Sequence, residues 1–250
     1  MAEDIHADLD HVAIGLWDVE EGARVAVEGA GGQVVARFGE KNWKGLQVAF
    51  VEGIRLELLE PVKDPLDDFL RRFLQRQGPA PHHLTFKVSD LRRAVGLLGR
   101  WGIEAVKVDL DSETWKEAFL HPKLGLGTVV QLAQPMVAWS AERELPPYPD
   151  GLLKSALIGV EVRANPAVSD RVYGELLQGR VQAVAGGVAY SWPGGGTVVV
   201  RPPGGHPFGV EKIVFRILRV PSGQQEPPRD APLYAGPTTL VRLWKEEEWP

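Results

Sequence analysis

The sequence contains no cysteine, which excludes disulfides, thiolate nucleophiles and zinc sites with cysteine ligands. Any metal ion must be bound by histidine, carboxylate, amide or water. No apolar run approaches the ~18 residues of a membrane span. Residues 1–10 are acidic and polar, whereas a secretion signal is basic and then apolar. We therefore expect a cytoplasmic protein with no membrane partner.

Basic stretches are also missing. Lys and Arg together number 28 against 33 Asp and Glu, which gives a net charge of -5. No segment is basic enough to follow a phosphate backbone, so we expect no nucleic acid partner. The 250 residues, 44% of them apolar and 24% charged, are typical of a globular chain with one large or two ordinary domains.

The chain contains an internal repeat. Residues 10–18 alternate apolar side chains after a histidine and end at an aspartate, and residues 82–90 do the same 72 positions later. An apolar-spaced helix follows each aspartate and ends near Gly31 or Gly102. Three strands then follow, near 33–38, 46–51 and 54–59 in the first copy and near 104–108, 115–120 and 127–132 in the second. Each copy is thus a βαβββ unit, which predicts an α+β fold.

The two copies, about 8–62 and 80–133, form a first module that spans residues 1–135. Between them, Asp64 and Pro65 open a helix with one apolar stripe, made of Leu66, Phe69, Leu70, Phe73 and Leu74. A proline-rich linker over 136–152 leads to a second module over 153–250. A third copy there has strands near 158–162, 181–184, 188–191 and 197–200 and a helix near 167–177. A fourth copy keeps strands near 212–218 and 239–243, with a loop in place of its helix.

Four polar residues interrupt the apolar strands of the first module at matched places. The first strands contribute His11 and His83, and the last strands contribute Glu57 and Gln131. Alternate side chains of a curved sheet point into its concave face, so these donors should converge. An unpaired polar group in such a strand costs about 1 to 3 kcal/mol, which favours a shared metal site over chance.

Several alternatives stay open at this point. His82 competes with His83 as a ligand, but register with His11 favours His83 and leaves His82 outward or behind the ligand. His6, His121 and His206 have no matched partner and are interpreted as structural or solvated. In the second module the four ligand positions are expected at Gly159, Val198, Lys212 and Arg242. That set would repel a divalent ion, so we expect no metal there, only packing, pocket closure or anion binding.

The first module resembles the vicinal-oxygen-chelate superfamily, whose members include glyoxalase I, methylmalonyl-CoA epimerase, extradiol dioxygenases and antibiotic-resistance proteins. The epimerase branch is the nearest in pattern, over about residues 8–135. The segments that carry the resemblance are Leu9-Asp10-His11-Val12-Ala13, Leu56-Glu57-Leu58-Leu59-Glu60-Pro61, His82-His83-Leu84-Thr85-Phe86 and Phe119-Leu120-His121-Pro122-Lys123. The resemblance implies half-barrel modules in tandem, which pair within the chain or across a homodimer.

The resemblance also implies one divalent ion per chain, cobalt, manganese, nickel, zinc or iron, bound by His11, Glu57, His83 and Gln131. In the epimerase the first repeat carries the glutamine and a catalytic glutamate, whereas here the roles are exchanged between repeats. Aligning residues 47–51 with 116–120 places Val48 opposite Glu117, which makes Glu117 the candidate acid or base. The competing interpretation of Glu117 is a solvated carboxylate at the module edge.

The function that the resemblance implies is proton transfer next to a carbonyl through a metal-stabilised enolate, with Glu57 and Glu117 as catalytic residues. The substrate would be a small molecule, with acyl-CoA as one candidate class. One alternative is an iron(II)-dependent extradiol-type dioxygenase, because two histidines and a carboxylate suit that chemistry. Another is a small-molecule-binding protein without catalysis. Trp17, Trp43 and Trp115 could line a pocket, although packing is the favoured interpretation.

Overall fold

The structure, a computed structural model, describes residues 5–62, 69–136, 147–149, 151–232, 234, 238–244 and 247–250. Its first half is an eight-stranded sheet in the order β2-β3-β5-β1-β6-β9-β8-β7. The elements are β1 (Asp8–Gly15), α1 (Val19–Ala30), β2 (Gln33–Gly39), β3 (Trp43–Ala49), β4 (Glu52–Gly53), β5 (Arg55–Pro61), α2 (Phe69–Gln77), β6 (Ala80–Lys87), α3 (Leu91–Arg100), β7 (Val106–Asp109), β8 (Trp115–Leu120), η1 (Pro122–Leu124) and β9 (Val129–Pro135). The two βαβββ units are confirmed.

The helices begin and end where the sequence predicts. The Asp18 side chain accepts hydrogen bonds from the first free backbone N–H groups of α1, and Asp90 does so for α3. Gly31 ends α1 in the left-handed conformation, with φ of 69°. Both helices bury their apolar stripe in the main core.

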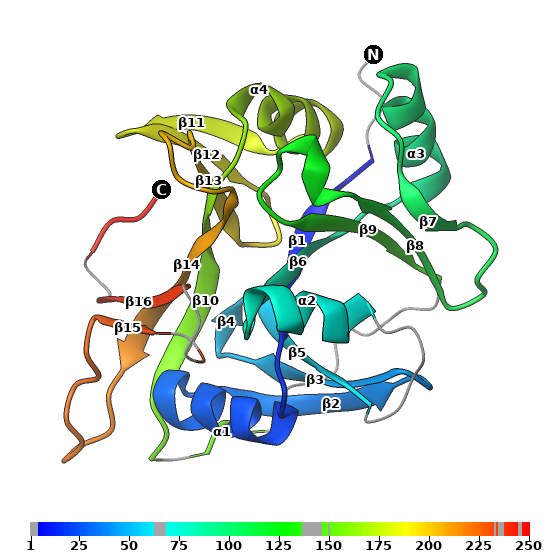
Figure 1. Cartoon of the computed structure of the whole chain (residues 1–250). Coiled ribbons are helices and arrows are strands. Elements are labelled where there is room, and N and C mark those ends of the chain that lie inside the picture. Colours follow the sequence, from blue (N-terminus) through cyan, green and yellow to red (C-terminus); the bar gives the residue numbers. More distant parts are fainter. Residues whose placement is uncertain are drawn as a thin grey trace.

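The first sheet curves around α2 (Figure 1). Leu70 and Leu74 of α2 are buried against Ala13 and Leu59, on the concave face of the sheet. The helix expected from Asp64 is thus present from Phe69 onward, and the start expected for it lies outside the described residues. Helix α2 therefore packs on the face of β1 and β5 that also carries the polar residues described below.

The second sheet has the order β11-β12-β13-β10-β14-β16-β15, and β4 of the first half pairs with β10. Its elements are β10 (Lys154–Arg163), α4 (Pro166–Ser169), η2 (Asp170–Leu176), β11 (Arg180–Val184), β12 (Gly187–Ser191), β13 (Thr197–Arg201), β14 (Gly209–Arg219), β15 (Asp230–Pro232) and β16 (Thr239–Trp244). The expected helix over 167–177 is in fact one α-helical turn followed by a π-helix. Strand β15, in the fourth copy, was not expected. Most of the expected linker, 137–146 and 150, lies outside the described residues.

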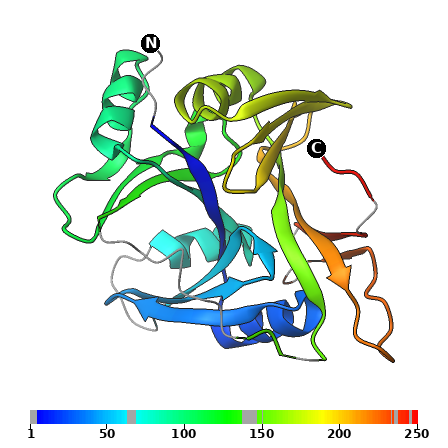
Figure 2. The same cartoon turned by 180° about the vertical axis from the view of Figure 1, so that it is seen from behind.

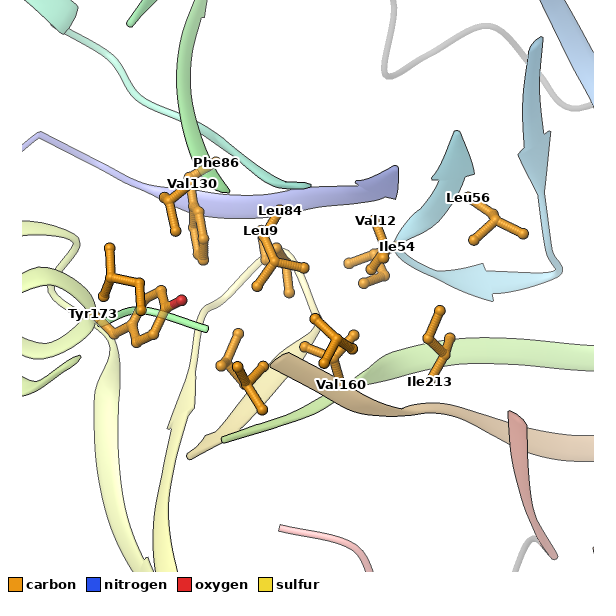
Figure 3. Packing of buried hydrophobic residues seen from close by; sticks show 14 of the residues in the cluster. Leu9, Val12, Ile54, Leu56, Leu84, Phe86, Val130, Val160, Tyr173 and Ile213 are labelled. Carbon is orange, nitrogen blue, oxygen red and sulfur yellow. The ribbon is translucent and has the colours of Figure 1, made fainter. Parts of the chain in front are cut away.

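The two sheets pack on each other through their convex faces, within one chain (Figure 2). Leu9 and Leu84 from the first sheet face Val160 and Ile213 from the second (Figure 3). The rings of Phe50 and Phe215 meet at 5.0 Å between centroids. Burial of this apolar surface is the main term that stabilises the fold. Because the shared core lies between the sheets, the concave faces point away from each other.

No helix in the described part of the chain is long and apolar enough to cross a membrane.

Candidate metal centre

Each of the four middle strands of the first sheet places one of the four expected donors on its concave face. His11 lies on β1, Glu57 on β5, His83 on β6 and Gln131 on β9, and their exposed fractions are 2%, 8%, 6% and 7%. Ala13 pairs with both Glu57 and His83, in the parallel and antiparallel directions. The register therefore sets these two side chains on either side of the strand that carries His11.

His11, Glu57 and His83 form a compact cluster. Oε2 of Glu57 lies 3.4 Å from Nε2 of His11, and Oε1 lies 3.8 Å from Nε2 of His83. One ligand atom from each residue falls within 4.8 Å of the others. Ligands bound at about 2.1 Å from a metal ion lie on the order of 3 to 3.5 Å apart. The three donors are thus close to the spacing that a divalent ion needs.

One buried atom in the cluster supports this fit. Nε2 of His11 is buried and makes no hydrogen bond to any described residue. An imidazole nitrogen without a partner in a buried site is costly unless it binds a ligand. Two imidazole nitrogens and a carboxylate are a donor set for zinc, iron, cobalt, nickel or manganese. The residues present fit a divalent metal ion.

Gln131 lies beside the cluster and is held from both ends of its amide. Its Oε1 accepts a hydrogen bond from Oγ1 of Thr85 at 2.6 Å, and its Nε2 donates to Oε2 of Glu117 at 2.6 Å. It also contacts the His83 side chain. An amide oxygen has two lone pairs, so the Thr85 bond leaves one for a metal ion. The geometry thus brings all four expected donors to one place.

Burial sets the electrostatics of the cluster. It raises the pKa of Glu57, an effect that the charge of His11 and a hydrogen bond with Gln47 oppose. It lowers the pKa of His83 well below the ordinary value, and the charges of His82 and His11 lower it further. His83 is therefore a neutral imidazole, the form that binds metal ions.

The pKa of His11 shifts in the opposite direction to that of His83, because the Asp10 carboxylate hydrogen-bonds His11. Burial acts to lower the pKa of His11, but Glu57 and Asp10 outweigh burial and raise it. Burial acts to raise the pKa of Asp10, but its contacts with His11 and Lys87 outweigh that and hold it below the ordinary value. Asp10 is therefore an ionised carboxylate directly behind His11.

Glu117, on β8, faces the same side as Gln131. Besides the bond from Gln131, its Oε2 accepts one from Nε1 of Trp115 at 3.2 Å. Burial raises the pKa of Glu117, and these two hydrogen bonds oppose the rise. A raised carboxyl pKa is typical of a general acid or base. A solvated carboxylate at the edge of the module, the competing interpretation of Glu117, would not make these two hydrogen bonds.

Residues 10–119 match a family model described as the Glyoxalase/Bleomycin resistance protein/Dioxygenase superfamily. The match covers 110 of the 250 residues, from β1 into β8. Among curated protein sequences, none matches the chain.

Solved structures of this superfamily's fold resemble the chain. A mutant of 4-hydroxymandelate synthase from Streptomyces coelicolor matches with a TM-score of 0.60 and 16% identity, over 85% of this chain and 71% of that one. Methylmalonyl-CoA epimerase from Mycobacterium tuberculosis matches with a TM-score of 0.47 and 23% identity, over 54% of this chain and 92% of that one. The first match extends the likeness in fold to both sheets.

Gln47 is a further polar residue of this site, and the sequence pattern did not predict its role. It is buried on β3 directly opposite Glu57, and its side chain hydrogen-bonds with Glu57. Its Oε1 also accepts a bond from Nη1 of Arg55 at 3.1 Å. A glutamine within the apolar segment 46–50 was the available signal.

The expected equivalence of Val48 and Glu117 is wrong. Gln47 pairs with Glu57 in the first repeat, and Phe119 pairs with Gln131 in the second. Matching the two pairs makes Gly45 the counterpart of Glu117. Val48 instead belongs to the main core on the other face. Gly45 carries no side chain. At this matched position of the third strand, therefore, a carboxylate is present in the second repeat and absent from the first.

Two of the four positions expected in the second module are also wrong by one residue. Glu161 pairs with Val199 on β13 and with Lys212 on β14, which repeats the pairing of Ala13 with Glu57 and His83. The counterpart of Glu57 is therefore Val199 and not Val198. By the same matching, Val241, which pairs with Val214, replaces Arg242 as the counterpart of Gln131. The corrected set still contains no metal-binding side chain.

The neighbouring aromatic residues fall into different roles. His82 packs between the rings of Phe69 and Phe73 on α2, and Nδ1 of His82 lies 2.8 Å from Nδ1 of His83. Trp115 contacts Glu117, so packing alone does not describe it. Trp43 packs against Phe38, and Trp17 is 47% exposed.

Proposed function

We propose that the chain is a divalent-metal-dependent isomerase or lyase that transfers a proton at a carbon next to a carbonyl group. The observation that carries this proposal is the pairing of two kinds of site on one concave face. A His11, Glu57 and His83 cluster lies beside Glu117, a half-buried carboxylate that is no part of the cluster. Gln131 connects them.

His11, Glu57, His83 and Gln131 would hold a divalent ion, which would supply a Lewis acid for a carbonyl oxygen of the substrate and so make the neighbouring C–H bond more acidic. Glu117 takes the proton from that carbon, and the electron pair of the C–H bond moves to the carbonyl as an enolate. Return of a proton to the carbon restores the carbonyl and completes an isomerisation.

The surroundings of Glu117 suit a proton carrier. Burial favours the protonated form, which is why its pKa is raised toward the range in which it both accepts and releases a proton. The bonds from Gln131 and Trp115 both reach Oε2 and leave Oε1 for substrate. Glu57, between the two histidines, is the second acid or base of the proposal.

Acyl-CoA thioesters are the substrate class that we propose to test first, since segments 9–13 and 56–61 resemble the epimerase branch. The experiment incubates the cobalt-loaded chain with methylmalonyl-CoA in D₂O and follows deuterium at the acidic carbon by mass spectrometry. The proposal expects exchange with the wild type and its loss in Glu117→Gln. Exchange that persists in Glu117→Gln would remove that residue from the mechanism. Metal binding without exchange in any 2-acyl thioester or 2-oxo compound would leave a small-molecule-binding protein.

A second candidate is iron(II)-dependent dioxygenation. It is favoured by the composition of the cluster, because His11, His83 and Glu57 alone form a group of two histidines and one carboxylate. Gln131 counts against it if its amide oxygen takes a further coordination position. Oxygen consumption by the iron(II)-loaded chain with catechols, set against deuterium exchange, separates the two reactions.

A further inference from the structure

The residue before each candidate histidine ligand lies in a β-bulge. Pairing between β1 and β6 shifts by one residue between Leu9 and His11, which leaves Asp10 as the extra residue. A second shift on β6, between Pro81 and His83, leaves His82 as the extra residue. Asp10 and His82 thus occupy equivalent places in the two repeats.

A bulge changes the direction of a side chain. In a regular strand, neighbouring side chains point to opposite faces of the sheet, so Asp10 could not reach His11. The bulge turns them to one side, as bulges beside functional sites do. As a result, Oδ2 of Asp10 lies 2.7 Å from Nδ1 of His11, and the two Nδ1 atoms of His82 and His83 lie 2.8 Å apart.

The second module has the same bulges without the same chemistry. Two of the three pairing shifts between β10 and β14 leave Ile158 and Glu211 as the extra residues, next to Gly159 and Lys212. Ile158 packs in an apolar cluster with Val214 and Trp249. The bulges are therefore a property of the fold. Among these four described bulge residues, Asp10 and His82 are the two that contact a histidine beside them.

Each of the two polar side chains is itself held in place. Oδ1 of Asp10 lies 2.5 Å from Nζ of Lys87, which pairs with Asp8 on the neighbouring strand. The ring of His82 contacts the rings of Phe69 and Phe73 at 5.4 and 4.9 Å between centroids. Neither side chain can swing away without breaking these contacts.

We propose that Asp10 and His82 are positioning residues that fix the tautomer and the ring orientation of the two metal-binding histidines. The inference rests on the proposed metal function and adds to it the residues behind the ligands. An acceptor at Nδ1 holds the proton there, which leaves the lone pair on Nε2. In both histidines Nε2 is the atom nearest Glu57.

Asp10 and His82 should affect their histidines to different degrees. The Asp10 carboxylate is an anion, so it increases electron donation by His11, whereas His82 gives His83 only a neutral acceptor. To accept from His83, His82 must itself carry its proton on Nε2. We therefore expect Asp10 to affect metal affinity more than His82 does.

The test compares the wild-type chain with Asp10→Asn, His82→Phe and a matched control, Glu211→Gln, which changes the bulge residue of the module without a metal site. Two properties are measured. Histidine ¹⁵N spectra of the metal-free protein report which ring nitrogen carries the proton. Titration with cobalt, followed by its visible absorption, reports affinity and coordination geometry. A purely structural role for Asp10 would move neither the tautomer nor the cobalt spectrum.

We expect His11 and His83 to be protonated at Nδ1 in the metal-free wild type. Asp10→Asn should weaken cobalt binding about 10- to 100-fold and His82→Phe less, while Glu211→Gln leaves it unchanged. Cobalt affinity equal to the wild type in Asp10→Asn and in His82→Phe would overturn this inference and leave the proposed function standing. Protons on Nε2 in the metal-free protein would also overturn it. A wild type that takes up no cobalt would overturn the proposed function itself.

Discussion

Nε2 of Gln131 donates a hydrogen bond to Glu117 over 2.6 Å, and this bond ties the candidate base to the candidate metal donors. The amide cannot rotate freely, because Thr85 holds its other end. Gln131 therefore fixes the position of Glu117 relative to His83. The spacing between the candidate metal donors and the candidate base is therefore set by strands β8 and β9.

Replacing Glu117 should separate chemistry from metal binding. In Glu117→Gln the side-chain oxygen still accepts from Gln131, so the fold and cobalt affinity should be unchanged. Loss of the proton acceptor should reduce deuterium exchange by about 10²- to 10⁴-fold. In the wild type, exchange should increase with pH as the carboxyl loses its proton, with a midpoint above the ordinary glutamate value of 4.5 because burial raises this pKa. A variant that loses cobalt as well would show that Glu117 acts through the metal site.

Glu161 should contribute to stability in a pH-dependent way. Burial acts to raise its pKa, but Lys212 at 2.9 Å and Arg201 at 3.1 Å outweigh burial and lower it below 4.5. The ionised form thus stabilises the folded state. That contribution is complete above the unfolded value and is lost as the pH falls through the lowered folded value.

Glu161→Gln should therefore reduce the free energy of unfolding at neutral pH by about 1 to 3 kcal/mol. The difference from the wild type should narrow in acid, below about pH 4. Urea denaturation of both proteins at the two pH values measures it. A difference that stays constant would mean that packing, and not charge, is lost.

Gly53 should be essential to the contact between the two halves of the chain. Its φ is 86°, and a Cβ atom there would lie 2.1 Å from the carbonyl oxygen of Leu157 on β10. Gly78 is the matched control, with φ of 69° and no atom within 4 Å of an added Cβ.

Gly78→Ala should cost only the backbone strain, about 1 to 2 kcal/mol. Gly53→Ala should cost about 1 to 3 kcal/mol more, because β4 must move away from β10. Denaturant unfolding curves of the two variants give the comparison. Equal costs would show that the contact between the halves adapts without loss.

The sequence predicted the repeat, the succession of helix and strands along the chain in each unit, and the four candidate donors, because polar residues are conspicuous in apolar strands. It could not give the pairing register. The offset between repeats is 72 residues for His11 and His83 but 74 for Glu57 and Gln131, since the intervening turns differ in length. The third strands keep the offset of 72, which matches Gly45 with Glu117, whereas the alignment of Val48 with Glu117 uses an offset of 69 that no residue of these apolar strands argues against.

The β-bulges at Asp10 and His82 could not be predicted from the sequence either. A regular alternation predicts that Asp10 and His82 point away from the concave face, and no residue type marks the extra position. In the second module, valines occupy two of the four ligand positions and give no polar signal. For this reason the sequence predicted Val198 and Arg242, each one residue away from the true counterparts Val199 and Val241.

The most direct test of the central claim is the metal content of the chain purified without chelator, compared with His83→Ala and with Lys212→Ala. Lys212 occupies the equivalent position in the second module, so it controls for the loss of a side chain at that place. We predict about one divalent ion per chain in the wild type and in Lys212→Ala, and none in His83→Ala. A wild-type chain that holds no metal and takes up neither cobalt nor manganese would contradict the account.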